Sequence, residues 1–345
     1  ATSDYGAPRD RRFHEWDMDD FDMSINGGID LSNPVEFPSF TWATVSKIAR
    51  QTAIMAQSGL KMTKFKADFS SYYETLPRAY DNFWCQIQLC SSDGFDIDTQ
   101  GVFGNREMPA LSSRVSTFYL YILKDRLQRL QWAWLNRWMI EADKTTENTS
   151  VQYRDQLQAV LERYSEVVGP SRPPPISDVL IVEQADDVPI ETRTAFVEWM
   201  TYRYSLGPQS QFSGEFWCMD VYIDDSFGSC FSFAANAFEE MYRKVWPEYK
   251  IQMADGTAGS SNKTFVVPGS EELITLGMNI VMPNLVVDDD FDTGTECGIL
   301  EVPEVKVQQY SALGARIKQI AELNGDKVPT PVVERFMGQM LWCCS

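Results

Sequence analysis

The spacing of apolar positions changes along the chain between a helical and a strand-like period. Residues 41–57 carry apolar side chains at helical spacing, namely Val45, Ile48, Ala49 and Ala53. This spacing predicts a short amphipathic helix. Residues 112–140 carry a longer apolar stripe, formed by Phe118, Ile122, Leu127, Leu130, Trp134 and Trp138. A stripe of this length predicts one long helix.

Strand-like patterns occur around two acidic positions. Residues 64–69 read as a strand that leads into Asp68. Residues 216–233 are rich in aromatic and β-branched side chains on both sides of Asp224 and Asp225. The second pattern predicts two strands joined by a tight acidic turn.

The order of elements predicts the fold class. Residues 143–211 contain a group of prolines, namely Pro170, Pro173, Pro174 and Pro175. Because proline breaks regular elements, we expect an insertion or surface excursion there. Residues 234–245 then have helical spacing, and residues 263–280 return to short strands. Strands and helices alternate without a regular βαβ rhythm, which favours an α+β fold with an antiparallel sheet.

The composition permits a large folded core. Of the 345 residues, 44% are hydrophobic and 13% aromatic, which suits one large domain or two closely joined subdomains. The chain begins at Ala1 rather than a methionine, so we expect it to be a piece of a longer protein. A formal net charge of −19 opposes a simple phosphate-binding surface, although a basic groove can exist on an acidic body.

Cysteine and histidine usage narrows the class of site. The seven cysteines form no C-x-x-C pair, which favours reduced thiols and an intracellular setting in the cytoplasm or nucleus. His14 is the single histidine, which excludes His-based triads and zinc sites. No apolar run approaches the roughly 20 residues of a membrane span, so we expect no membrane partner.

Three carboxylates suggest a site for phosphoryl transfer. Asp224 and Asp225 follow Tyr222 and Ile223 at the predicted hairpin tip, where adjacent carboxylates repel each other unless a cation neutralises them. Mg²⁺ prefers such oxygen ligands. Taken alone, the pair reads more readily as solvated turn residues, and Asp68 could cap the turn after its strand. A metal clamp for phosphoryl transfer, however, needs carboxylates from separate strands, and Asp68 supplies the second strand.

These acidic positions belong to a longer series of motifs. In chain order the motifs are Asp68 with Tyr73 and Pro77, Phe103-Gly104 with Pro109, Tyr222-Ile223-Asp224-Asp225, and Asn262-Lys263-Thr264 with Leu276-Gly277. Taken together they resemble reverse transcriptases, most closely those of DIRS-like retrotransposons. Residues 24–30 also resemble the fingers motif of that group, and residues 328–342 the start of a thumb or connection. The resemblance covers most of the chain in the expected order.

The resemblance implies a right-hand polymerase palm, in which helices back an antiparallel sheet. The implied division of the chain is fingers over 1–66 and 79–102, palm over 67–78 and 103–285, and primer grip with the start of a thumb over 286–345. The proline-rich insertion at about 143–211 lies within the second palm segment. The implied function is RNA-directed DNA synthesis on an RNA or DNA template–primer duplex with deoxynucleoside triphosphates.

The resemblance also implies roles for the acidic residues. Asp68 and Asp224 would bind two Mg²⁺ ions, with Mn²⁺ as an alternative, and Asp225 would support the site from its periphery. These ions would activate the primer 3′-hydroxyl and steady the triphosphate. Lys263 would protonate or attract the pyrophosphate leaving group, although a surface lysine is an equally good reading.

Substrate-binding roles follow from the same resemblance. Tyr73 would stack under the sugar and exclude a ribose 2′-hydroxyl, and its alternative is a core tyrosine. Gly104, between Phe103 and the later Pro109, would let template or nucleotide approach the backbone, and its alternative is a turn glycine. Tyr222 would face the substrate beside the acidic pair.

Two other functions stay open at this point. A degenerate palm that binds nucleic acid or a protein without catalysis is favoured by the charge of −19 and by residues 105–107, which replace small residues of the family pattern. An RNA-dependent RNA polymerase shares the palm chemistry. Tyr222 and Tyr73 favour DNA synthesis over that second alternative.

Overall fold

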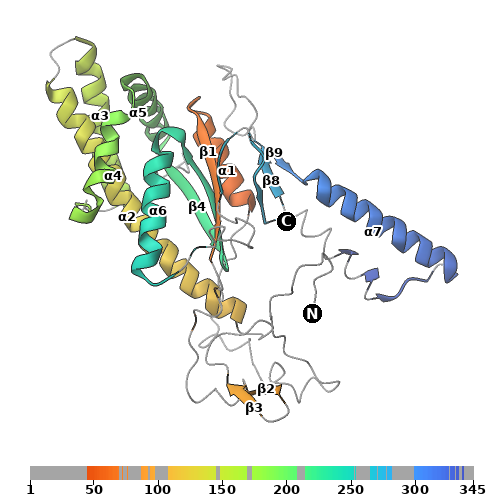
Figure 1. The fold of residues 1–345 in the computed structure, drawn as a ribbon. Helices are drawn as coiled ribbons and strands as arrows, with labels where there is room; N and C mark the ends of the chain where they lie inside the picture. The colour runs from red at the N-terminus through yellow and green to blue at the C-terminus, as the bar shows by residue number, and fades with distance from the viewer. Residues whose placement is uncertain are drawn as a thin grey trace.

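The computed structural model describes the part of the chain from which the fold is built. The described residues are 45–69, 72, 76, 87–91, 94–97, 108–144, 148–168, 173–207, 214–251, 253, 265–269, 271–276, 278–281, 299–325, 327–330, 332–333 and 336–337. Within them helices and antiparallel strands mix, which confirms the α+β class. Figure 1 shows the sheet between helices, with one long helix extending away from it.

The longer helices are α1 (Val45–Ala56), α2 (Met108–Lys144), α3 (Asn148–Val168), α4 (Val179–Glu183), α5 (Ile190–Ser205), α6 (Ala235–Glu248) and α7 (Glu304–Leu323). Among the described residues, short 3-10 helices accompany them at η5 (Ile176–Asp178), η6 (Gln184–Asp187) and η8 (Ser232–Ala234). The strands are β1 (Met62–Asp68), β2 (Ile87–Ser91), β3 (Gly94–Ile97), β4 (Trp217–Tyr222), β5 (Asp225–Phe231), β6 (Phe265–Pro268), β7 (Ile274–Thr275), β8 (Met278–Val281) and β9 (Ile299–Glu301).

The main sheet has four antiparallel strands in the order β4-β5-β1-β6. The hairpin β4–β5 therefore lies beside β1, although a long stretch of sequence separates them. Gly228 of β5 lies opposite Phe65 of β1 and Met219 of β4. A Cβ at Gly228 would collide with the backbone oxygen of Cys218, so this strand contact requires glycine. Two smaller antiparallel sheets are β2–β3 and β7-β8-β9.

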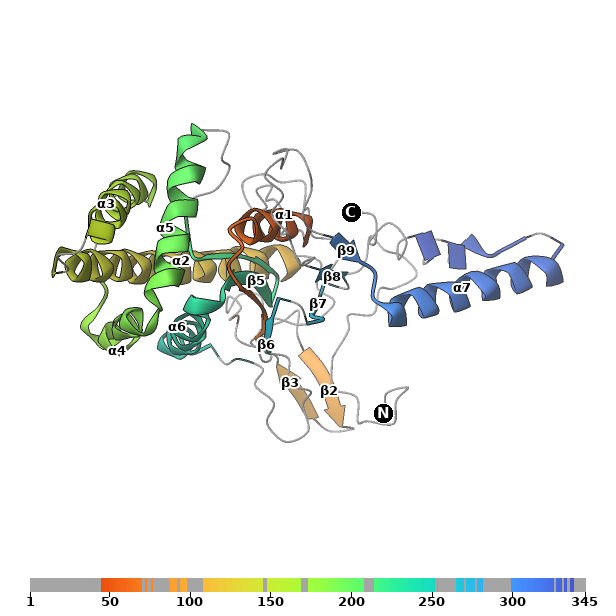
Figure 2. The same ribbon diagram turned by 90° about the horizontal axis from the view of Figure 1, so that it is seen from above.

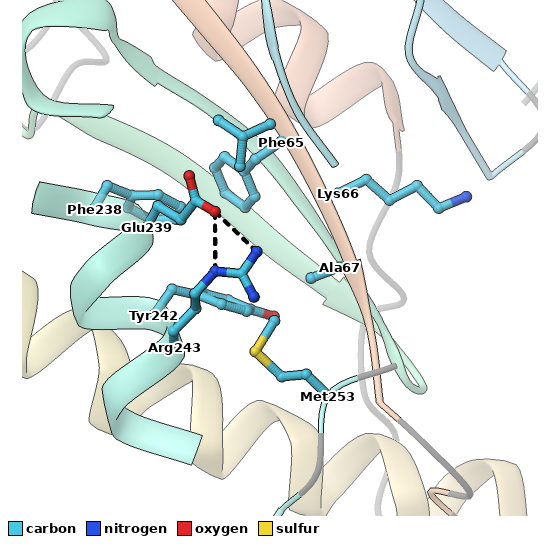
Figure 3. Close-up of a pocket in the computed structure, with 9 residues that line it drawn as sticks. Phe65, Lys66, Ala67, Phe238, Glu239, Tyr242, Arg243 and Met253 are labelled. Atoms are coloured by element: carbon cyan, nitrogen blue, oxygen red, sulfur yellow. Dashed lines mark hydrogen bonds and ion pairs between the residues drawn. The ribbon is translucent and has the colours of Figure 1, made fainter. Parts of the chain in front are cut away.

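Helices cover both faces of the main sheet. On one face Phe65 of β1 packs on Phe238 of α6, with ring centroids 4.4 Å apart. Figure 3 shows Phe65 and Ala67 directed toward this helix, beside a small pocket that Tyr242 also lines, whereas Lys66 extends to the opposite side of β1. The alternation is that of a strand buried on a helix-covered face. This face joins the large apolar core that includes residues of α2, α3 and α5.

Helix α1 covers the opposite face. The Thr52 hydroxyl of α1 donates to the Ser229 hydroxyl of β5 over 2.8 Å. Val45 and Ile48 belong to a second apolar cluster with Phe227 of β5. In Figure 2, α1 lies on the other side of the strands from α6. The main sheet is thus the middle layer of three.

Several expectations from the sequence are confirmed. The predicted helix over 41–57 is α1 within its described residues, the strand into Asp68 is β1, and the acidic hairpin is β4–β5. The long helix is α2, but its predicted apolar stripe is wrong at Phe118, which is 61% exposed. Leu120 and Leu123 are buried instead, at helical spacing from Leu127 and Leu130, so the buried arc of α2 passes through them and not through Phe118.

The expectation of an irregular surface excursion over residues 143–211 is wrong for its described residues, whereas the expectation of an insertion relative to the family pattern stays a prediction. Its described residues form α3, α4 and α5, and both Tyr164 and Phe196 from them are 0% exposed in the main core. Of the prolines that suggested a break, Pro175 immediately precedes η5, and a further proline, Pro189, immediately precedes α5. Proline is tolerated at helix starts, so it marks the beginning of helices here rather than an irregular loop.

Candidate carboxylate site at the hairpin tip

The hairpin β4–β5 turns within two residues. Tyr222 pairs with Asp225 as the last ladder pair, which leaves Ile223 and Asp224 as the loop. Ile223 has a φ of 58°, and a two-residue hairpin needs a positive φ at its first loop position. A β-branched residue in this region costs about 1–2 kcal/mol. The turn is therefore held by the ladder on both sides rather than by the preference of its own residues.

Asp68 lies at the end of the neighbouring strand and faces this hairpin. It is 4% exposed and pairs across the sheet with Asp225. Directly opposite residues of an antiparallel pair project to the same face. The pairing of β1 with β5 thus places Asp68 directly beside the turn that carries Asp224 and Asp225.

The segment after Asp68 is anchored by aromatic packing. The Phe69 ring lies 5.3 Å from that of Tyr72 and 5.1 Å from that of Trp246 of α6. The Tyr72 hydroxyl donates to the backbone oxygen of Ser112 of α2 over 3.0 Å. These contacts tie the end of β1 to two helices and hold Asp68 in one position.

The electrostatics of the three carboxylates are unfavourable to full ionisation. Burial raises the pKa of Asp224 to about 7, and repulsion from Asp68 and Asp225 adds to the rise. A hydrogen bond between the carboxyl groups of Asp224 and Asp68 also favours the protonated form. The Asp224 carboxyl group therefore ionises only near neutral pH, and a bound cation would relieve the repulsion from its neighbours.

This donor set fits an open magnesium site. Mg²⁺ in proteins is usually held by one or two carboxylates, with waters and substrate phosphates completing its shell. Asp68 and Asp224 supply two such carboxylates, and Asp225 adjoins them. Within the described part of the chain, no three His, Cys, Asp or Glu side chains converge as ligands of one ion. These residues therefore do not form a site in which protein ligands alone complete the coordination of the ion.

Two predicted substrate-binding residues are placed by the structure. Tyr222 is half-buried and packs against the second apolar cluster together with Leu276. Pro109 lies in the first turn of α2, where its missing N–H has no helical partner to lose. Pro109 therefore has a sufficient structural reason for its position.

The remaining predicted site residues lie outside the described part of the chain. They are Tyr73, Phe103, Gly104 and Lys263. The structure also reveals buried polar residues near the site that the sequence pattern did not single out, above all Lys64 in the centre of β1. A lysine in a strand that alternates apolar with polar residues, as Lys64 and Lys66 alternate with Phe65 and Ala67, reads from sequence as an exposed position.

Comparisons with known proteins add no relative. No family model matches the chain, and neither a curated protein nor a solved structure does. The described helices include none that combines the length and apolar character needed to cross a bilayer.

Proposed function

We propose that the chain is the polymerase core, fingers plus palm, of an enzyme that resembles reverse transcriptases and adds deoxynucleotides to a primer. The observation that carries the proposal is the meeting of Asp68 with Asp224 and Asp225 at one end of the main sheet. Asp68 comes from β1 and the other two from the neighbouring β4–β5 hairpin, so two separate segments supply the carboxylates that a metal clamp for in-line phosphoryl transfer needs. The antiparallel sheet with α2 and α6 on one face suits a palm.

The energetic cost of the site supports a functional reading. A buried carboxyl group with a pKa near 7 beside two further carboxylates destabilises the fold at neutral pH. Clustered groups with strongly perturbed pKa values are typical of functional sites. The strained turn at Ile223 adds to this cost at the same place. Solvated turn residues would require neither feature.

Each candidate residue would have its own role in nucleotide addition. Bound Mg²⁺ would supply charge neutralisation at the phosphates and a lowered pKa for the primer 3′-hydroxyl. Asp68 and Asp224 would hold the metal ions, Mg²⁺ or Mn²⁺. Because the β1–β5 pairing fixes the positions of these carboxylates, the ions would bind in one place. Asp225 would contribute negative charge from the edge of the site. By resemblance, Lys263 would act on the leaving group.

Substrate selection would come from the neighbouring motifs. Tyr73 would exclude a ribose 2′-hydroxyl, while Phe103, Gly104 and Pro109 would line the approach of template and nucleotide. Tyr222, which lies next to the acidic pair, would border the primer end. The template–primer duplex, of RNA or DNA, would lie between fingers (1–66 and 79–102) and palm, with residues 286–345 as primer grip and start of a thumb.

Primer extension on poly(rA)–oligo(dT) with Mg²⁺ or Mn²⁺ tests the proposal, with dTTP and UTP compared as substrates. Extension with dTTP but not UTP is the expected result. Extension with UTP alone would favour an RNA polymerase. A folded protein that extends with neither nucleotide would favour a palm that binds without catalysis.

A further inference from the structure

Lys64 is a buried cation in the middle of the main sheet. It lies on β1, four positions before Asp68, and is 2% exposed. Transferring an ammonium group out of water is costly unless hydrogen bonds compensate it. Burial accordingly lowers the pKa of Lys64, against the opposing influence of Glu272 and Glu271. A lysine in this position needs a structural reason.

The partners of Lys64 all belong to the small three-stranded sheet and its entry. Its Nζ donates to the backbone oxygen of Ile280 in β8 over 2.9 Å and to that of Glu271, just before β7. One side chain thus joins the strand of Asp68 to both ends of the β7–β8 hairpin. Lys66, two residues along, reaches only the backbone oxygen of Ile274 at 3.3 Å and in a more exposed place.

Apolar side chains also connect the small sheet to the β4–β5 hairpin. Met278 and Ile280 of β8 share the second apolar cluster with Phe227 of β5, and both Tyr222 and Leu276 pack against it. Leu276, which follows β7, and Tyr222, which precedes the acidic loop, thus pack against the same apolar cluster. Figure 2 shows β7, β8 and β9 beside β6 and below α1.

We infer that Lys64 is a positioning residue that fixes the β7-β8-β9 sheet to the strand of Asp68. A primer strand that contacts this small sheet would then meet the carboxylates in one constant geometry. This second step rests on the proposed function, whereas the mechanical link does not. Charge-assisted hydrogen bonds to two backbone oxygens suit this role, because two such bonds fix both the spacing and the relative orientation of β1 and the small sheet.

Hydrogen–deuterium exchange of the full chain tests the link without any assay of activity. In Lys64→Met, amides of residues 271–281 are expected to exchange about 10-fold faster than in the wild type, while β4 and β5 keep their protection. Lys64→Arg retains donors and is expected to restore most of the protection. Lys66→Met is the matched control and is expected to change exchange less than about 3-fold.

Single-nucleotide addition separates the two parts of the inference. In an active wild type, Lys64→Met is expected to lower kcat about 10-fold while Mn²⁺ still raises its melting temperature as in the wild type.

Unchanged exchange over residues 271–281 would overturn the link, and so would global unfolding of Lys64→Met, since Lys64 would then support the main sheet. Faster exchange with unchanged kcat would overturn the positioning role. An inactive wild type with faster exchange would refute the proposed function and keep the link.

Discussion

Replacing Asp224 by asparagine is expected to stabilise the metal-free protein while removing its response to Mg²⁺. The folded-state pKa of Asp224 is about 7 because of burial and of repulsion from Asp68 and Asp225, against an ordinary value of 3.8. A carboxyl group with a raised folded-state pKa contributes its full stability below pH 4. That contribution is lost as the pH rises to about 7.

The size of the effect follows from the two pKa values. They differ by about 3 units, and at 1.36 kcal/mol per unit the wild type loses about 4 kcal/mol between pH 4 and pH 8. Asparagine has the same size and cannot ionise, so Asp224→Asn is expected to gain about 2–4 kcal/mol at pH 8. At pH 5 the gain should shrink to about 2 kcal/mol or less, because much of the cost is then absent from the wild type.

Urea unfolding in EDTA, followed by the fluorescence of the ten tryptophans, measures this difference. Adding Mg²⁺ at ten times its dissociation constant should stabilise the wild type by about 1.4 kcal/mol and leave Asp224→Asn unchanged. Asp220→Asn, in β4 of the same hairpin, is the matched control. Its carboxylate pairs with the exposed Lys47 at 2.6 Å, so its loss should cost less than about 1 kcal/mol. An Asp224→Asn protein that is less stable than the wild type at pH 8, or that still responds to Mg²⁺, would refute the reasoning.

Three further predictions concern the scaffold, and urea unfolding checks each of them. Gly228→Ala should cost about 3 kcal/mol, because the new methyl group meets the backbone oxygen of Cys218 and forces β4 from β5. Asp178→Asn should cost about 3 kcal/mol, since Asp178 is 0% exposed and its carboxylate pairs with Arg126 and Lys244. Phe196→Ala should cost about 3–5 kcal/mol through the cavity that it leaves in the core.

Controls for these predictions come from matched positions. Gly314→Ala, in α7, meets no atom closer than 4.0 Å and should stabilise the protein by up to about 1 kcal/mol. Asp125→Asn removes an exposed ion pair with Arg129 and should cost less than about 1 kcal/mol. If Phe196→Ala were as mild as these surface changes, α5 would not belong to the main core.

The sequence predicted best the elements whose local signals are strong. The acidic hairpin was predictable because strand-like residues border a tight turn. Its proximity to Asp68 could be expected only because the proposed chemistry needs two strands; the ladder of β1 with β5 provides the actual contact. The raised pKa of Asp224 could not be predicted, since it depends on burial that the sequence does not encode locally.

The helices and the buried lysine that the sequence did not predict were missed for specific physical reasons. Helices α3 to α5 were not predicted because Pro170 and Pro173 to Pro175 suggested a break across the whole segment, whereas Pro175 lies just before the start of η5, where proline is tolerated. Helix α7 was also not predicted, although Tyr310, Leu313, Ile317 and Ile320 stand at helical spacing, and none of its residues is buried in the structure. Lys64 was missed because a charged residue in a strand is normally solvent-exposed, and only the tertiary position of β8 supplies its partners.

Addition of one nucleotide to a primer annealed to a defined RNA template tests most directly whether Asp68 and Asp224 form a nucleotidyl-transfer site. With Mg²⁺ or Mn²⁺, the wild type and Asp220→Asn are expected to extend the primer. Asp68→Asn and Asp224→Asn should be slower by at least about 100-fold, or about 3 kcal/mol. Wild-type rates in either of these two variants, or no addition by the folded wild-type protein with either ion, would contradict the proposed site.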